Sequence, residues 1–141
     1  MAYNTIVVKG YPSRKEDVAA ETITPGHLIA LTSANKLIKH AVAAAKAQTM
    51  FAIENEVFGQ GIDVNYVVND NVLYGVFRPG DEVNALVAAA APAIVIGDYV
   101  ESAGNGTVRK VATVATAIGM ARQAVDNSAG GAPARLLIEI L

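Results

Sequence analysis

The sequence predicts a mainly β protein, folded as one small β-barrel or β-sandwich. Turn-forming pairs such as Gly-Asp recur along the chain, and each is followed by residues that can begin a strand. Apolar and polar residues alternate between several of these turns. The alanine-rich run 41–47 is too short for a stable helix, because isolated helices below ~12–15 residues are marginal. Short strands separated by turns at roughly 10-residue intervals are typical of sandwiches and barrels.

The repeated turn pairs a residue that tolerates positive φ with a polar residue. It occurs as Gly80-Asp81 and Gly97-Asp98, as a degenerate Asn69-Asp70, and in a looser form as Gly26-His27. Glycine adopts positive φ without steric cost, and aspartate hydrogen-bonds to its own main chain. We expect each turn to reverse the chain and start a strand. This role explains Asp70, Asp81 and Asp98 without paired-carboxylate chemistry.

In the N-terminal part, residues 3–8 alternate loosely before a break at residues 10–12, which indicates a strand or an extended arm. Segments of this kind often pack on a neighbouring molecule. The charged residues 13–17 are expected on a solvated stretch, and residues 18–23 lead into the first turn. Residues 27–31 and 36–40 then form a predicted hairpin, and residues 41–47 a loop or one helical turn. The fold therefore has at most one short helix.

The central part contains three predicted strands. Residues 49–54 alternate, and residues 59–61 form a bend. In residues 62–66 the apolar positions fall on one face, which is the period of a half-buried strand. Residues 72–77 are apolar on both faces and indicate a covered, central strand.

The next run, residues 86–96, carries neither a charge nor a hydrogen-bonding side chain and contains Pro92. A membrane-spanning helix needs ~20 apolar residues, and an interior proline costs a helix ~3 kcal/mol. We therefore expect no membrane segment, but a strand over 82–88, a connection at 89–92 and a short approach, 93–96, to the next turn. Strands at 99–102 and 107–111 flank Asn105-Gly106, a typical hairpin turn. Residues 117–125 and 136–141 complete the strands, separated by a flexible loop.

The composition limits the function. The 141 residues suit one domain, here divided into an N-terminal arm and lead-in, 1–23, and a β-rich domain, 24–141. Cysteine is absent, which removes thiol catalysis and Cys-type zinc sites. The first residues lack the pattern of a secretory signal, so synthesis in the cytoplasm is expected. Hydrophobic residues make up 52% and charged residues 17% of the chain, against about 25% charged in ordinary domains. Either alanine is simply exposed on a monomer, or another subunit covers part of the surface.

Catalytic or ligand-binding patterns are weak. His27 and His40 are the only histidines, and each is expected at a turn or on the surface. The glycines at 59–61 and 104–106 lack the Lys-Ser/Thr of a phosphate loop, and metal-ligand spacing is missing. We expect no cofactor. The 11 Lys and Arg residues are scattered, so nucleic-acid binding is not expected. A carrier domain would display a modifiable lysine at a hairpin tip, but Lys110 lies inside a predicted strand.

Three blocks of the sequence stand out: residues 50–63, 72–83 and 96–107, which read MFAIENEVFGQGID, VLYGVFRPGDEV and IGDYVESAGNGT. They resemble the head decoration, or cement, proteins of tailed bacteriophages. The similarity extends from the turn at 24–27 to the final strand. It implies a small β-tulip-like domain on the outer capsid surface of the virion, commonly a homotrimer at three-fold or quasi-three-fold sites. The implied partners are the major capsid protein and the chain itself, and no catalytic residue is implied.

With this resemblance, seven residues become candidates for partner contacts. The arm and its rim charges are assigned to the shell, and Arg78 to a polar contact between subunits. The candidates are Tyr3, Ile6, Val8, Tyr11, Arg14, Lys15 and Arg78. The alternatives are a small β-barrel ligand-binding or carrier module, or an enzyme too degenerate to recognise. The aromatic content of 6% and the absence of tryptophan argue against carbohydrate binding.

Overall fold

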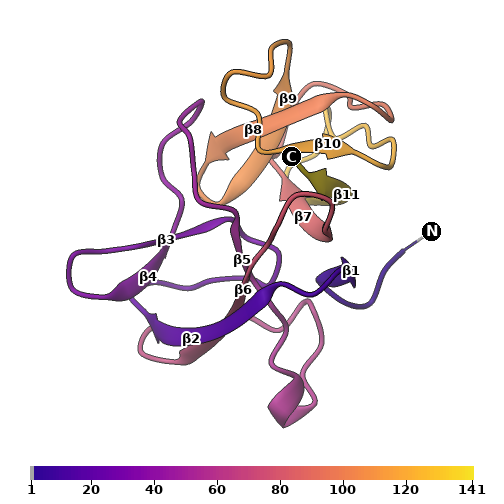
Figure 1. Ribbon diagram of the computed structural model, residues 1–141. Helices are drawn as coiled ribbons and strands as arrows, with labels where there is room; N and C mark the ends of the chain where they lie inside the picture. The colour runs from indigo at the N-terminus through magenta and orange to yellow at the C-terminus, as the bar shows by residue number, and fades with distance from the viewer. Residues whose placement is uncertain (1) are drawn as a thin grey trace.

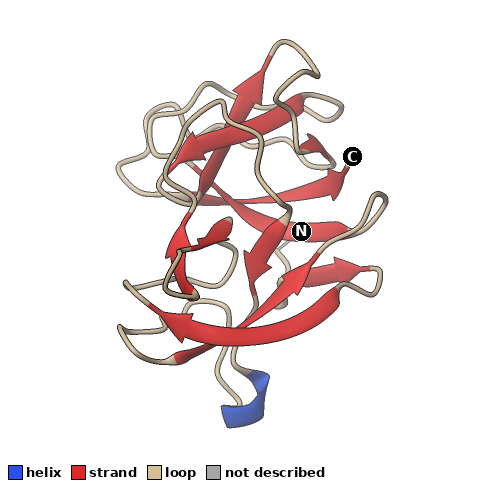
Figure 2. Cartoon of the chain, turned by 60° about the vertical axis from the view of Figure 1, so that its left-hand side comes forward, coloured by secondary structure: helices blue, strands red, loops and turns tan. Residues whose placement is uncertain are grey.

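A computed structural model describes residues 2–141, and the fold is almost entirely β, as predicted (Figure 1). Within the described residues the only helix is a single 3-10 turn, η1 (Glu56–Phe58). Residues 41–47 are irregular. Figure 2 shows the strands gathered in an upper and a lower group, with η1 projecting from the lower end.

The upper group is a six-stranded sheet in the order β1-β7-β11-β10-β8-β9. Its strands are β1 (Val7–Lys9), β7 (Glu82–Val87), β8 (Tyr99–Gly104), β9 (Thr107–Val111), β10 (Gly119–Ala121) and β11 (Ala134–Ile140). The antiparallel pairing of β7 with β11 runs from Val87 opposite Ala134 to Glu82 opposite Glu139. A parallel pairing of Val87 with Val108 also joins β7 to β9, so the sheet closes on itself.

The lower group is a five-stranded sheet in the order β3-β4-β2-β6-β5. Its strands are β2 (Ser13–Ala19), β3 (Ile29–Leu31), β4 (Lys36–Lys39), β5 (Met50–Ala52) and β6 (Asn71–Val76). β6 lies between β2 and β5, which confirms the prediction of a central strand. A single bridge between Leu28 and Phe51 links the two edges of this sheet.

The repeated turn is confirmed in all four places. In each turn the last side chain accepts a hydrogen bond from the backbone N–H three residues earlier. The bond is 2.9 Å at Asp70, Asp81 and Asp98, and 3.0 Å at His27. The residue before the acceptor has positive φ in every copy: 96° at Gly26, 73° at Asn69, 93° at Gly80 and 92° at Gly97. β6, β7 and β8 begin directly after three of these turns, and β3 begins shortly after the fourth.

Two apolar cores hold the strands together. The larger core contains side chains from both sheets, including Phe51 of β5 and Val83 of β7. Phe51 and Phe77 meet edge to face, with ring centroids 5.6 Å apart. The smaller core lies under the five-stranded sheet and contains Leu37, Val72 and other residues of its strands.

The N-terminal region differs from the predicted extended arm. Ile6 is fully buried, β1 pairs with β7, and β2 pairs with β6 and β4. Residues 13–17, predicted as a solvated stretch, therefore lie in a strand. Their side chains through position 16 are exposed, but their backbone is held by β6, a partner far away in sequence that alternation cannot reveal.

Two further predicted strands are wrong or too long. Residues 62 and 63 form a turn, and only Tyr66 in this segment makes a bridge, to Ile23. The predicted apolar face is not buried as a unit, because Tyr66 is buried while Val64 remains 44% exposed. In the predicted strand 117–125, only Gly119–Ala121 is a strand. None of the described helical structure has the length and hydrophobicity of a membrane span.

Candidate interaction surface

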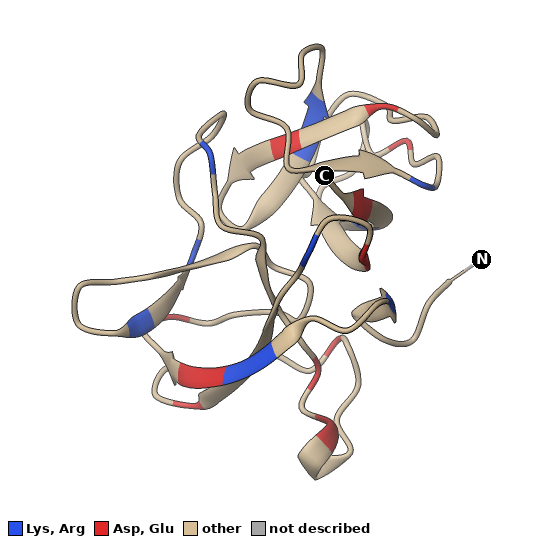
Figure 3. Cartoon of the chain, viewed as in Figure 1, with Lys and Arg blue, Asp and Glu red and all other residues tan. Residues whose placement is uncertain are grey.

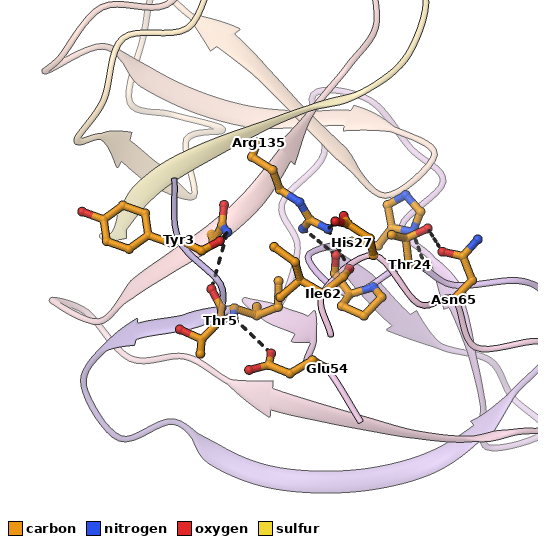
Figure 4. A network of polar contacts seen from close by, with 12 residues as sticks. Tyr3, Thr5, Thr24, His27, Glu54, Ile62, Asn65 and Arg135 are labelled. Carbon is orange, nitrogen blue, oxygen red and sulfur yellow. Dashed lines mark hydrogen bonds and ion pairs between the residues drawn. The ribbon is translucent and has the colours of Figure 1, made fainter. Parts of the chain in front are cut away.

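The first candidate residues lie along the N-terminal segment (Figure 4). Ile6 is fully buried, and its N–H donates to Glu54 Oε2 at 3.1 Å. The carbonyls of Tyr3 and Thr5 both accept from the Asn84 side chain at 3.4 Å. The structure therefore assigns Ile6 to the core, where no partner reaches it. Tyr3 and Val8 are half-buried and keep part of their surface exposed.

The four remaining candidates lie on or near β2. Tyr11 is 90% exposed, and Lys15 is also exposed. Arg14 forms an ion pair with Glu56 of η1, and the Arg78 guanidinium donates to Ser13 Oγ at 3.4 Å. Tyr11, Arg14, Lys15 and Arg78 thus remain exposed, with Arg14 already paired to the loop between β5 and β6.

Arg135 of β11 connects the two sheets, a role that the sequence did not indicate. Its guanidinium donates to the carbonyls of Pro25 at 2.6 Å and Ile62 at 2.8 Å, and it pairs with Asp63 at 3.3 Å (Figure 4). Gly26 lies against the same group: a Cβ there would come within 2.3 Å of Arg135 Nη1. The close approach of Arg135 leaves no room for a side chain at position 26. The hydrogen bond from Arg135 to Pro25 also fixes this turn to β11.

His27 belongs to the same region and is buried. Its Nδ1 accepts the N–H of Thr24, so the neutral ring carries its proton on Nε2. Burial, with smaller effects from Lys39 and Arg135, lowers the pKa of His27 to about 4. The ring is therefore neutral near pH 7 and has a structural task in the turn.

The other polar candidates are also occupied within the fold. His40 Nδ1 lies 2.8 Å from Ser102 Oγ, and burial lowers the pKa of His40. Arg109 pairs with the buried Glu101 at 2.9 Å, and Lys110 of β9 pairs with Asp98 at 2.9 Å. Lys110 is thus not a lysine displayed at a hairpin tip. Among residues 2–141, no group of three or more His, Asp or Glu side chains could hold a metal ion.

A groove of about 670 Å³ lies beside the N-terminal segment. Its lining includes Tyr3, Ile96, Arg122, Val125 and Arg135. Tyr3 is the only aromatic residue among those that line the groove. The Arg135 guanidinium is already bonded to the carbonyl of Pro25. The groove therefore offers no stacked rings for a sugar, and its two arginines, Arg122 and Arg135, pair with Glu82 and Asp63.

The largest concentration of exposed apolar side chains lies on the loop between β5 and β6. Val57 and Phe58 in η1 are 76% and 77% exposed, and Val64, Val67 and Val68 follow at 44%, 57% and 51%. The sequence predicts a bend and a strand in this segment and does not indicate an exposed apolar cluster. The exposure depends on where the chain finds strand partners, which the local sequence does not reveal.

Comparison with protein-family models and with curated proteins finds no match for this chain. Its structure is similar to the head fiber gp8.5 N base in bacteriophage phi29, with a TM-score of 0.64 and 10% sequence identity. The similarity covers 93% of this chain and 95% of that one. At this level of identity the likeness is one of fold, and it extends over both sheets.

Proposed function

We propose that this chain is a structural protein of a bacteriophage head. The observation that carries the proposal is the fold shared with the phi29 head fiber base over nearly the whole of both chains. The low proportion of charged residues, 17%, agrees with a surface that other proteins cover. The cations are spread over both sheets, and several pair with nearby carboxylates (Figure 3).

In its finer form, the proposal is that the protein decorates the outer surface of the assembled head as a homotrimer and stabilises the shell. The sequence blocks that resemble decoration proteins support this form. A ligand that binds only the assembled shell stabilises it by RT ln(1 + [L]/Kd), or ~2.7 kcal/mol per site at a hundredfold excess over Kd. Three linked contacts raise the effective concentration at each remaining site, so each contact can be modest.

The test is to mix the purified protein with heads that lack it, taken from the phage that encodes the chain. Electron microscopy should reveal added density at regular positions on the outside, and decorated heads should release their DNA at a higher temperature. Light scattering of the free protein tests the trimer separately. A protein that leaves the heads bare at micromolar concentration would refute the head-associated role.

A further inference from the structure

The loop of residues 53–70, here called the projecting loop, extends away from both sheets and carries η1 at its end (Figures 1 and 2). Val57 and Phe58 at the tip expose more than three quarters of their surface. A hollow of about 500 Å³ separates them from Tyr66 and Asp70 on the returning part of the loop. Clustered apolar side chains on a protrusion are typical of surfaces that contact another protein.

Hydrogen bonds and an ion pair support the projecting loop at its tip and near its base. Gly59 ends η1 with a φ of 67°, and its N–H donates to the carbonyl of Glu56 at 3.1 Å. The Tyr66 hydroxyl donates to the carbonyl of Ile53 at 2.7 Å and ties the two ends of the loop together. The Arg14 ion pair fixes Glu56 to β2. A fixed tip loses little conformational entropy on binding, which favours affinity.

The charge of the loop indicates the chemistry of its partner. Residues 53–70 contain Glu54, Glu56, Asp63 and Asp70 and no Lys, Arg or His. Glu54 is buried, and Arg14 and Arg135 pair with two of the others, yet the loop itself remains acidic. A complementary surface has an apolar depression for the tip and basic residues around it.

A second copy of this chain fits these requirements poorly. Two loops placed tip to tip would bring carboxylates together. The hollow lined by Lys46, Thr49, Val114, Ile118 and Leu141 is partly polar, and it lies by the C-terminus in the upper group of strands, away from η1 (Figure 1). Contacts between opposite ends of successive copies are head-to-tail, and they close into a ring only when the rotation between copies fits a ring.

We propose that the projecting loop is the anchor of this protein on the head, with Val57 and Phe58 inserted into an apolar cleft of the capsid surface that has a basic rim. This inference rests on the proposed function and replaces Ile6, which the core already uses, as an apolar contact to the shell. Of the N-terminal candidates, Arg14 and Lys15 lie beside this anchor, because they line a hollow together with Val57.

The test compares two double variants in binding to undecorated heads. Val57→Ser with Phe58→Ser removes the apolar tip, while Val42→Ser with Val114→Ser removes side chains that are 60% and 56% exposed elsewhere. Losing one buried apolar side chain corresponds to about tenfold to a hundredfold in Kd. We therefore expect the tip variant to bind heads at least tenfold more weakly, with an unchanged melting temperature, and the control variant to bind normally.

A second readout uses the absence of cysteine from the chain. Phe58→Cys and Val42→Cys each provide one thiol for a polarity-sensitive dye, whose emission should shift to the blue on head binding only at position 58. Wild-type binding should also weaken as NaCl is raised from 0.1 to 0.5 M, roughly the range over which screening becomes strong.

The outcomes separate this inference from the proposed function. If the wild type leaves heads bare, the head-associated role fails. If the wild type binds and the tip variant binds equally well, the anchor assignment is wrong and the role stands. A tip variant that changes only the oligomeric state would show that the loop contacts a second copy. Binding that does not depend on salt would show that the capsid cleft has no basic rim.

Discussion

The His27 ring is buried and accepts a hydrogen bond through Nδ1. Protonation of this ring at low pH should therefore lower the stability of the folded protein. A protonated imidazole has only donors, and the N–H of Thr24 would then lose its acceptor. Burial lowers the pKa of His27 to about 4 from the ordinary 6.5. The unfolded chain therefore binds a proton as the pH falls through 6.5, while the folded chain resists until the pH nears 4.

The magnitude follows from these two pKa values. At ~1.4 kcal/mol per pH unit, the interval between them corresponds to about 3 kcal/mol of stability, fully present above pH 6.5 and lost below pH 4. At pH 5 the loss is about 2 kcal/mol. This is a large part of the 5–15 kcal/mol that is typical of whole domains, so the acid limb of the stability curve should be steep.

Urea unfolding at pH 7.5, 6.5, 5.5 and 5.0 tests this reasoning in wild type and His27→Asn. Asparagine can keep the acceptor of the turn but does not titrate. The difference in unfolding free energy between the two proteins should therefore change by about 2 kcal/mol between pH 7.5 and 5.0, in favour of the variant at low pH. Carboxylates common to both proteins cancel in this difference. Parallel curves would refute the argument, and His40→Gln serves as the control at a less buried ring.

Three other substitutions test the packing. Gly26→Ala should lower the free energy of unfolding by more than about 2 kcal/mol, because alanine is strained at a φ of 96° and its Cβ would meet Arg135. Gly61→Ala, with open space around it, should be near neutral in the same urea unfolding experiment. Arg135→Lys should lose about 1–3 kcal/mol, since an ammonium cannot replace both hydrogen bonds to the carbonyls; an unchanged urea midpoint would contradict the two-sheet connection. Ile6→Ala should lower stability by about 2–5 kcal/mol, while Tyr11→Ser should leave the melting temperature unchanged.

Local chemistry made the strand starts predictable. A positive φ before an acceptor side chain is encoded within four residues, so Gly80-Asp81 and Gly97-Asp98 identify β7 and β8 without knowledge of the rest of the fold. The hairpin of β8 and β9 follows from Asn105-Gly106 for the same reason. The failures came where pairing is distant. β2 is a strand because β6 binds its backbone, and residues 62–66 are not a strand because only Tyr66 among them pairs with another segment, through Ile23.

The candidate contact residues show the same difference between features set by neighbouring residues and features set by distant parts of the chain. Exposure of Tyr11 follows from its place between Gly10 and Pro12, but the burial of Ile6 depends on Glu54 and β7, which lie far along the chain. Alternation in residues 3–8 could not tell a segment that packs on its own domain from one that packs on a neighbour. The apolar tip at Val57 was equally hidden, because η1 has no periodic pattern.

One of the four repeated turns has a histidine, His27, where the other three have an aspartate. Asp70 is exposed and Asp98 is half-buried, but Asp81 is as buried as His27, at 8%, so burial alone does not decide between a carboxylate and an imidazole. His27 differs because it lies between the two sheets beside Arg135. The Arg135 guanidinium is already satisfied by two carbonyls and Asp63, so a carboxylate at position 27 would lose water without gaining a full partner. A neutral imidazole supplies the same acceptor with a smaller desolvation cost. The consequence is that the turn joining the two sheets is also the one most sensitive to acid.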